Sequence, residues 1–487
     1  MVGFYTNAIK PIGELPTNSS VWPFKRHVVI HPERQSLRSA LLLTSLLLAV
    51  FAVDDHAKAA EQMRPITATE ALRQDIVPGA SSIDLSFKAP QEQHEAWIEF
   101  ITKGNHEFTN ARWKEALNAY QASLAIGHAL VKLDMINKEW QHDVVVSLIM
   151  IGNTKAEMED FQGAADVYHA SLDLSKKLAD SDPFNQEWQR DIAVSLIKIG
   201  MNKLALRDSQ GALEACQTGL SITQKLSRET PDNREWERDI AVGSFIMGMI
   251  EQTKGNREAA LEAYQSSLTI TRRLSTENPD NVDLHHDIQL TLKKIGSLKK
   301  EHGDVQGALD AYQEHHDICR RIVELDPDSP ARRRDVSLSL AMIGDVKRAA
   351  ADTQGALNAY NASLEMTRKL VNLDSRSLPW KRDMVLSANR IGDVKMETGD
   401  RQGAREAYEQ ALEINRKRIS EVSNELETQS DLVTSLLKVG GINGDIRLIQ
   451  EARLILQKLD EDNRLNAQLR DQRDTIDQLF ADRLSRH

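Results

Sequence analysis

The sequence has only two cysteines in 487 residues, Cys216 and Cys319, and they stand far apart in the chain. A disulfide framework needs several paired cysteines and a thiolate metal site needs closely spaced ones, so both are excluded. We interpret both residues as small buried apolar side chains, the usual state of unpaired cysteines. Cys319 has more cationic neighbours than Cys216, because Arg320 and Arg321 follow it.

An excess of positive charge is also missing. Lysine and arginine total 61 against 72 aspartates and glutamates, which gives a net charge of −11 with both signs interspersed. Such a chain does not attract a polyphosphate backbone, so nucleic acid is not expected as a partner. The sequence contains no phosphate-binding glycine loop, nucleophile elbow or helical metalloprotease motif. We therefore predict a protein that is not an enzyme and that uses no cofactor and no metal.

The N-terminal region reads as an export signal. Basic residues at Lys25, Arg26, Arg34 and Arg38 precede an apolar run from Ala40 to Val53, and small residues follow at 57–60. Basic, apolar and small-residue regions in this order are typical of a signal peptide. Fourteen apolar residues make a helix of about 21 Å, which is shorter than the roughly 30 Å core of a bilayer.

We therefore expect residues 1–59 to be a signal peptide with a long basic region, cleaved near Ala59 and Ala60, and a periplasmic or secreted protein in a bacterium. The long region before Ala40 indicates either a translation start placed too far upstream or a signal that stays attached as an anchor in the inner membrane, and the sequence does not decide between them. Residues 60–90 contain Pro65, Pro78, Gly79 and Pro90 and are expected to form a linker.

From residue 91 onward the chain repeats with a fixed step of 48 residues. No insertion interrupts this step, and a constant period of this length is typical of stacked helical or sheet units. The positions that recur are a tryptophan, an aspartate, a glycine and a tyrosine, namely Trp140, Trp188, Trp236 and Trp380; Asp143, Asp191, Asp239, Asp287, Asp335, Asp383 and Asp431; Gly104, Gly152, Gly200, Gly248, Gly296, Gly344, Gly392 and Gly440; and Tyr120, Tyr168, Tyr264, Tyr312, Tyr360 and Tyr408, with Cys216 in place of one tyrosine.

Each unit is predicted to be two helices joined by a short polar turn. In residues 185–228 two stripes of apolar residues follow helical spacing on either side of residues 207–210. A proline precedes most units and is followed two residues later by Asn or Ser, as at Pro183 and Asn185, which indicates a helix stop and the next N-cap. The recurring glycine is expected to let the two helices approach closely while the tyrosine fills the adjoining space.

This pattern resembles the tetratricopeptide repeat. Ile151, Gly152, Ala164, Tyr168 and Ser171 are similar to that family's large-apolar, glycine, alanine, aromatic and small positions. The unit is longer than the usual 34 residues of the family and is similar to its long bacterial variants. The resemblance implies an all-α solenoid of about eight antiparallel helix pairs over residues 91–460. Residues 461–487, with Leu465, Leu469, Ile476, Phe480 and Leu484, are predicted to form a capping helix.

Two sets of polar residues could be mistaken for a reactive site. The recurring aspartates stand one per unit, so stacking spreads them along the array and a catalytic role is not expected. Near a helix start they can accept hydrogen bonds from exposed amides or from a neighbouring arginine, which would join the units. One unit also collects His285, His286, His302, His315 and His316. These imidazoles could bind a transition metal if His285 or His286 met the His315 and His316 pair; otherwise they are surface and boundary residues.

The resemblance also implies that the first helix of each unit lines a concave groove. Apolar residues dominate in the first half of the array and charged ones in the second, so the groove could hold an apolar segment followed by an acidic one. The opposite interpretation makes the apolar residues core contacts between successive units. The groove positions are Ile101, Asn105 and Phe108; Ile149, Asn153 and Ala156; Ile197, Met201 and Leu204; Phe245, Met249 and Gln252; Lys293, Ser297 and Lys300; Ala341, Asp345 and Arg348; and Asn389, Asp393 and Met396.

We expect from these observations a non-catalytic scaffold or adaptor that holds a partner protein or peptide in this groove. A membrane-anchored sensor or regulatory subunit is the alternative if the signal is retained, and a metal-dependent enzyme built on the histidine-rich unit is a further one. Membrane contact is expected only through an uncleaved anchor, and the sequence does not determine an oligomeric state.

Overall fold

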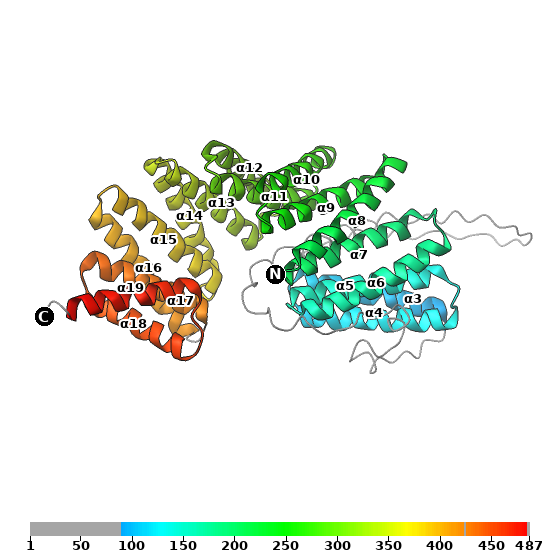
Figure 1. Cartoon of the computed structure of the whole chain (residues 1–487), viewed down its shortest axis with the longest axis horizontal. Helices are drawn as coiled ribbons and strands as arrows, with labels where there is room; N and C mark the ends of the chain where they lie inside the picture. The colour runs from blue at the N-terminus through cyan, green and yellow to red at the C-terminus, as the bar shows by residue number, and fades with distance from the viewer. Residues whose placement is uncertain (1–88, 423–424, 485–487) are drawn as a thin grey trace, which may run out of the picture.

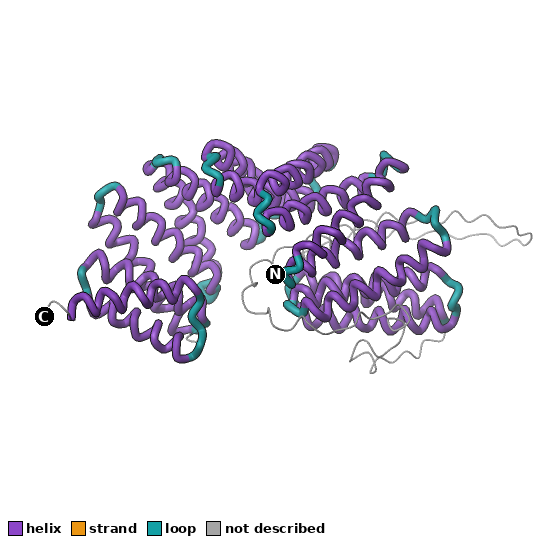
Figure 2. Tube along the Cα trace, viewed as in Figure 1, coloured by secondary structure: helices purple, strands orange, loops and turns teal. Residues whose placement is uncertain are grey.

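The computed structural model describes residues 89–422 and 425–484. The predicted signal peptide and cleavage site, and all of the predicted linker except its last two residues, lie outside this part. Every regular element within the described residues is an α-helix, and there are 17 of them. Figure 2 shows these helices joined by short loops.

The helices form eight successive pairs and one final helix, which confirms the predicted all-α solenoid with its capping helix. Their bounds are α3 Pro90–Thr109 and α4 Trp113–Leu133; α5 Lys138–Glu157 and α6 Phe161–Ser181; α7 Gln186–Ala205 and α8 Ser209–Glu229; α9 Arg234–Thr253 and α10 Arg257–Glu277; α11 Val282–Glu301 and α12 Val305–Leu325; α13 Pro330–Ala349 and α14 Thr353–Leu373; α15 Leu378–Glu397 and α16 Arg401–Glu421; α17 Leu426–Asn443 and α18 Ile446–Glu461; and α19 Ala467–Leu484.

The pairs stack into an arch, which Figure 1 shows from its side. Each helix packs mainly on the helices before and after it in the chain. The first helices of neighbouring pairs also touch, as α5 with α7, α7 with α9 and α13 with α15, whereas no two second helices make as much contact. The first helices therefore lie along the inner side of the curve, and we call this surface the inner face.

Two recurring caps fix where the helices begin. The predicted caps Asn185, Asn233, Asn281 and Ser329 each accept a hydrogen bond from a backbone N–H of the first turn. At the turn inside a pair, an aspartate does the same for the second helix. Asp160 accepts from the Gly163 N–H at 2.9 Å and also binds Lys155 at 2.7 Å. The same aspartate and glycine recur at Asp208, Asp304, Asp352 and Asp400.

The recurring glycine has the steric role that the sequence predicted. A Cβ atom placed on Gly344 would lie 2.5 Å from a ring carbon of Tyr360, and Gly152 stands in the same relation to Tyr168 at 2.4 Å. The tyrosines are buried against the glycine of the facing helix. The two helices of a pair can therefore approach only because the first helix has no side chain at this point.

The last helices close the stack. Leu469 and Ile476 of α19 are buried in one apolar cluster with Leu432 of α17 and Leu456 of α18, and Leu465 joins them from the preceding turn. This confirms the capping helix; the side chains of Phe480 and Leu484 are outside the described part. None of the described helices combines the length and the apolar composition that crossing a bilayer requires.

Replacing Gly344 with alanine is expected to lower the free energy of unfolding by about 1–3 kcal/mol, because the new methyl group overlaps the ring of Tyr360. Gly441 of α17 is the matched control, since a Cβ there meets nothing within 4 Å. Gly441→Ala should be neutral or stabilising, as alanine favours helix. Urea unfolding followed by circular dichroism measures both. Equal effects of the two substitutions would contradict the steric account.

Candidate partner-binding face

The structure buries most of the apolar residues that the sequence assigned to a groove. Ile149, Ile197, Phe245 and Met249 are each less than a tenth exposed, and Phe108 packs edge-on against Trp113. Ile197, Phe245 and Met249 belong to one cluster with Ile288 and Ile295 of α11. They are core contacts between successive first helices, as the alternative interpretation held. The long helices bring each unit over its neighbour at these positions, so no partner can reach them here.

The polar residues at the next groove position bind the tyrosine of their own unit. The Tyr120 hydroxyl donates to Asn105 at 2.8 Å, and the Tyr168 hydroxyl donates to Asn153 at 2.9 Å. Tyr360 and Tyr408 donate in the same way to Asp345 and Asp393, both at 2.7 Å. Asn105 and Asn153 are buried. Their role in this structure is to hold the two helices of one pair together, which sequence reasoning missed.

The remaining groove positions are accessible to different degrees. Ile101, Met201 and Leu204 are half-buried and pack on the edges of the apolar clusters, and Lys300 is exposed. Arg348 is half-buried and binds Glu397 of the next pair through its Nε at 3.0 Å. The polar half of the inner face is therefore the more accessible half.

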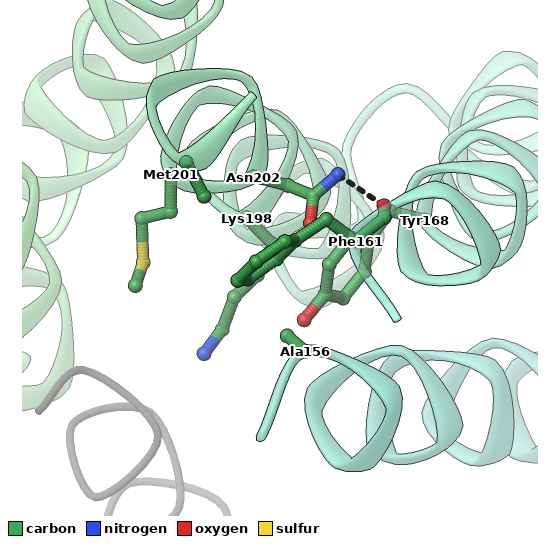
Figure 3. A pocket seen from close by; sticks show the side chains of 7 residues that line it. Ala156, Phe161, Tyr168, Lys198, Met201 and Asn202 are labelled. Carbon is green, nitrogen blue, oxygen red and sulfur yellow. Dashed lines mark hydrogen bonds between the residues drawn. The ribbon is translucent and has the colours of Figure 1, made fainter. Parts of the chain in front are cut away.

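Figure 3 shows a small pocket between α5, α6 and α7, which Phe161, Tyr168, Lys198 and Met201 line. The Asn202 side chain closes it by donating to the Phe161 carbonyl at 2.7 Å. Burial lowers the pKa of Lys198 to about 8, and the nearby Glu157 opposes this change. The volume open to water is about 30 Å³. This holds about one or two water molecules, so the pocket cannot serve as a site for a metabolite.

In the last units, basic residues cross the inner face from one pair to the pair before it. Arg390 of α15 binds Asp345 of α13 at 2.9 Å, and Lys438 of α17 binds Asp393 of α15. The corresponding residue of α11 is Lys294. The residue 45 positions before it, which is acidic in the two pairs above, is Met249. The acidic partner is therefore replaced by an apolar residue.

Lys293 and Lys294 have no ion-pair partner among the described residues. Burial lowers the pKa of Lys293, and Asp335 opposes the change. Burial also lowers the pKa of Lys294, with further repulsion from Lys293. Two partly buried cations that repel each other are costly for the folded chain. With the exposed Lys300 they form what we call the basic site, on α11 in the middle of the arch.

The recurring aspartates join neighbouring units, as the sequence predicted. In each joint the residue one place before the aspartate position of one unit, an arginine or a histidine, binds the aspartate of the next. Arg190 contacts Asp239 at 2.6 Å and 3.2 Å. The other joints are His94 with Asp143, His142 with Asp191, Arg238 with Asp287, Arg334 with Asp383 and Arg382 with Asp431. We call this series the aspartate ladder. Its members lie far apart along the array and form no reactive cluster.

The ladder is interrupted once, between α11 and α13. His286 occupies the basic position, but its Nδ1 lies 3.2 Å from the Gln289 side-chain oxygen, and it makes no ion pair with Asp335 in the described structure. Gln289 also donates to the Cys319 sulfur at 3.1 Å. The first unit has Trp97 at the place of Gln289, and all the others have Ala, Val or Ser. That exchange is the signal in the sequence that could have revealed the interruption.

The clustered histidines surround this interruption. His315 is buried beside Cys319, with its Nδ1 3.7 Å from the sulfur, and His316 Nδ1 lies 2.8 Å from the Ser339 hydroxyl. His285 contacts the Pro279 carbonyl at 2.7 Å. No group of three or more His, Cys, Asp or Glu side chains in the described ranges is arranged to hold a metal ion. Burial raises the pKa of both cysteines, Cys216 and Cys319, to about 12.

The buried His315 makes stability depend on pH. Burial lowers its pKa from 6.5 to about 3, with repulsion from Lys293, His316 and His286 adding to the change. Below pH 6.5 the unfolded chain therefore binds more protons at this residue than the folded chain, and folding weakens as pH falls.

Between pH 7 and pH 5 the wild type should lose up to about 2 kcal/mol more unfolding free energy than His315→Ser. Serine stands at this place in most other units. His302→Ser, at an exposed residue of the same unit, should keep the wild-type pH dependence. Urea titrations at several pH values give the comparison. Parallel curves for the wild type and His315→Ser would refute this assignment.

Comparison with known proteins agrees with this architecture. Residues 387–418, which span the α15–α16 turn and most of α16, match the family model of the tetratricopeptide repeat. No curated protein matches the sequence of the chain.

Among solved structures, the fold is similar to the apo form of RapI, with 11% identity, coverage of 80% of this chain and 99% of that chain, and a TM-score of 0.52. Two further similar structures are the S. pombe nuclear import adaptor Nro1, with 11% identity, coverage of 61% and 99% and a TM-score of 0.43, and BtubC from P. vanneervenii, with 18% identity, coverage of 53% and 92% and a TM-score of 0.41. The likeness to RapI supports the overall fold.

Proposed function

We propose that this array of tetratricopeptide-like helix pairs is a non-catalytic scaffold that holds a protein or peptide partner along its inner face. The observation that carries the proposal is the basic site on α11. The cations at the place of Lys294 in α15 and α17, Arg390 and Lys438, are paired with acidic residues of the preceding pair, whereas Lys294 and its neighbour Lys293 have no ion pair among the described residues. An acidic segment of a partner would supply the missing charge.

The geometry supports a long, extended contact rather than a deep one. The apolar groove positions of the first half are buried between the units, so a partner contacts the face mainly through polar and charged groups. Lys293 and Lys300 lie on the same helix, α11, and Arg348 has the place of Lys300 on α13. Ile101, Met201 and Leu204 offer smaller apolar contacts toward the other end. Surface charges of this kind determine which partner binds and how fast more than they add affinity.

The cellular setting remains a proposal from the sequence. The basic residues and the apolar run from Ala40 to Val53 support export to the periplasm or beyond, with cleavage near Ala59 and Ala60. Retention of this run would instead make the protein a membrane-anchored sensor or regulatory subunit. N-terminal sequencing of the mature protein separates the two: a start near residue 60 supports cleavage, and an intact N-terminus supports an anchor.

Neutralising the basic site should weaken the binding of an acidic partner. We expect Lys294→Gln with Lys300→Gln to reduce affinity about tenfold and to lower its dependence on salt, because the attraction is electrostatic. The matched control is Lys369→Gln with Lys417→Gln, which removes the same charge from exposed lysines of the second helices α14 and α16.

The partner is first co-purified from the envelope fraction with the wild-type protein, and its affinity for each variant is then measured by fluorescence anisotropy. Circular dichroism shows that each variant is folded. Equal affinity of the inner-face variant and the control would place the partner elsewhere, and a selective loss in the control would place it on the outer helices.

A further inference from the structure

Four large apolar side chains project into solvent from two neighbouring loops. Leu133, Met135 and Ile136, at the junction of α4 and α5, are 59%, 75% and 82% exposed. Phe184, in the loop between α6 and α7, is 93% exposed. We call these four residues the apolar edge. Exposed apolar residues are common when scattered, but four on adjacent loops mark a contact surface.

The same kind of turn exposes the residue at the tip of each loop, which is Ile136 in the first loop and Phe184 in the second. The Asp134 carboxylate accepts a hydrogen bond from the Ile136 N–H at 3.1 Å, and the Asp182 carboxylate accepts from the Phe184 N–H at 3.2 Å. The turn recurs in a later unit, where Asp374 accepts from Arg376 at 2.9 Å. Arg376 is fully exposed there. The turn therefore projects whichever residue occupies this place.

The remaining units show that the apolar tips are particular to the start of the array. The residues at the place of Ile136 and Phe184 in the next three units are Asp232, Asp280 and Asp328. The loops are also held in shape, because the Gln141 side chain donates to the Met135 carbonyl at 2.7 Å. Preformed tips lose little conformational freedom when they enter a binding surface.

The topology places the apolar edge beside the point where the N-terminal segment joins the array. Each first helix begins where the preceding second helix ends, so all first helices begin on one edge. The first helix, α3, begins at Pro90 and thus starts on the same edge as the two loops. Figure 1 shows both loops at the right-hand edge of the molecule. The apolar run from Ala40 to Val53 precedes Pro90 in the chain.

We propose that the apolar edge inserts into the interface of a lipid bilayer, so that the first two helix pairs lie on a membrane surface. Separate protruding tips enter a soft interface easily, whereas a protein surface would need a matching hole for each tip. The tips are apolar, and the charges that flank them in the sequence are mixed at the first loop, with Lys132, Asp134 and Lys138, and acidic at the second, with Asp180 and Asp182. Insertion is therefore driven by apolar burial and does not require anionic lipid.

The depth of the tips in a membrane tests the proposal in the full chain. Phe184→Cys and, as the matched control, Arg376→Cys are labelled with an environment-sensitive dye; Cys216 and Cys319 are buried and should react slowly. Vesicles of phosphatidylcholine, or of phosphatidylethanolamine with phosphatidylglycerol, are then added. We expect a blue-shifted emission and quenching by a lipid-borne quencher at position 184 in both kinds of vesicle, and neither effect at position 376.

Binding is measured separately, because the apolar run could itself enter the vesicles. In a chain carrying Leu43→Asp and Leu47→Asp, adding Ile136→Asn with Phe184→Asn should weaken partition into vesicles at least tenfold. Leu373→Asn, at the 60% exposed last residue of α14 in a later unit, should not. A water-like dye at position 184 with vesicles in excess would overturn the proposal. The proposal would also be overturned if a co-purified protein shielded this dye from water and vesicles did not.

Discussion

The contact on which the array depends is the pair formed by a basic residue of one unit and the aspartate of the next. The aspartates at these joints are partly or fully buried, and a buried carboxylate without its cation is strongly destabilising. Because the basic residue and the aspartate come from successive units, each joint requires the same number of residues between them. This accounts for a step that stays constant over the whole array. It also makes each unit depend on its immediate neighbours.

The one interrupted joint gathers the unusual chemistry of the chain. His286 replaces the basic residue, Gln289 enters between it and Asp335, and His315 and Cys319 are buried beside them. The unpaired Lys293 and Lys294 lie on the same helix. Units that bind only each other have their charges paired, so a unit with unpaired charges is the natural place for an outside partner. The basic site and the apolar edge lie at different ends of the first five pairs. The protein could therefore contact a partner and a membrane at the same time.

The sequence predicted the fold because its signals are local and repeated. The step of 48 residues, the proline followed by Asn or Ser, and the glycine facing a tyrosine each determine one helix end or one close contact. The candidate site was predicted less well. Burial of Ile149, Ile197 and Phe245 depends on how closely neighbouring first helices approach, which no single unit encodes. Asn105 and Asn153 were assigned to a partner because their tyrosine lies 15 residues away, on the other helix. A role of the aspartates in joining units was predicted because they recur once in every unit.

Hydrogen exchange of the wild type and of His286→Arg tests the role of the ladder most directly. Arginine at this place supplies the cation that four other joints have, and it can reach Asp335 as Arg238 reaches Asp287. If the ladder holds the units together, the amides of α12 and α13 exchange more slowly in the variant, while those of α7 and α9 are unchanged. Unchanged or faster exchange in α12 and α13 would contradict the account.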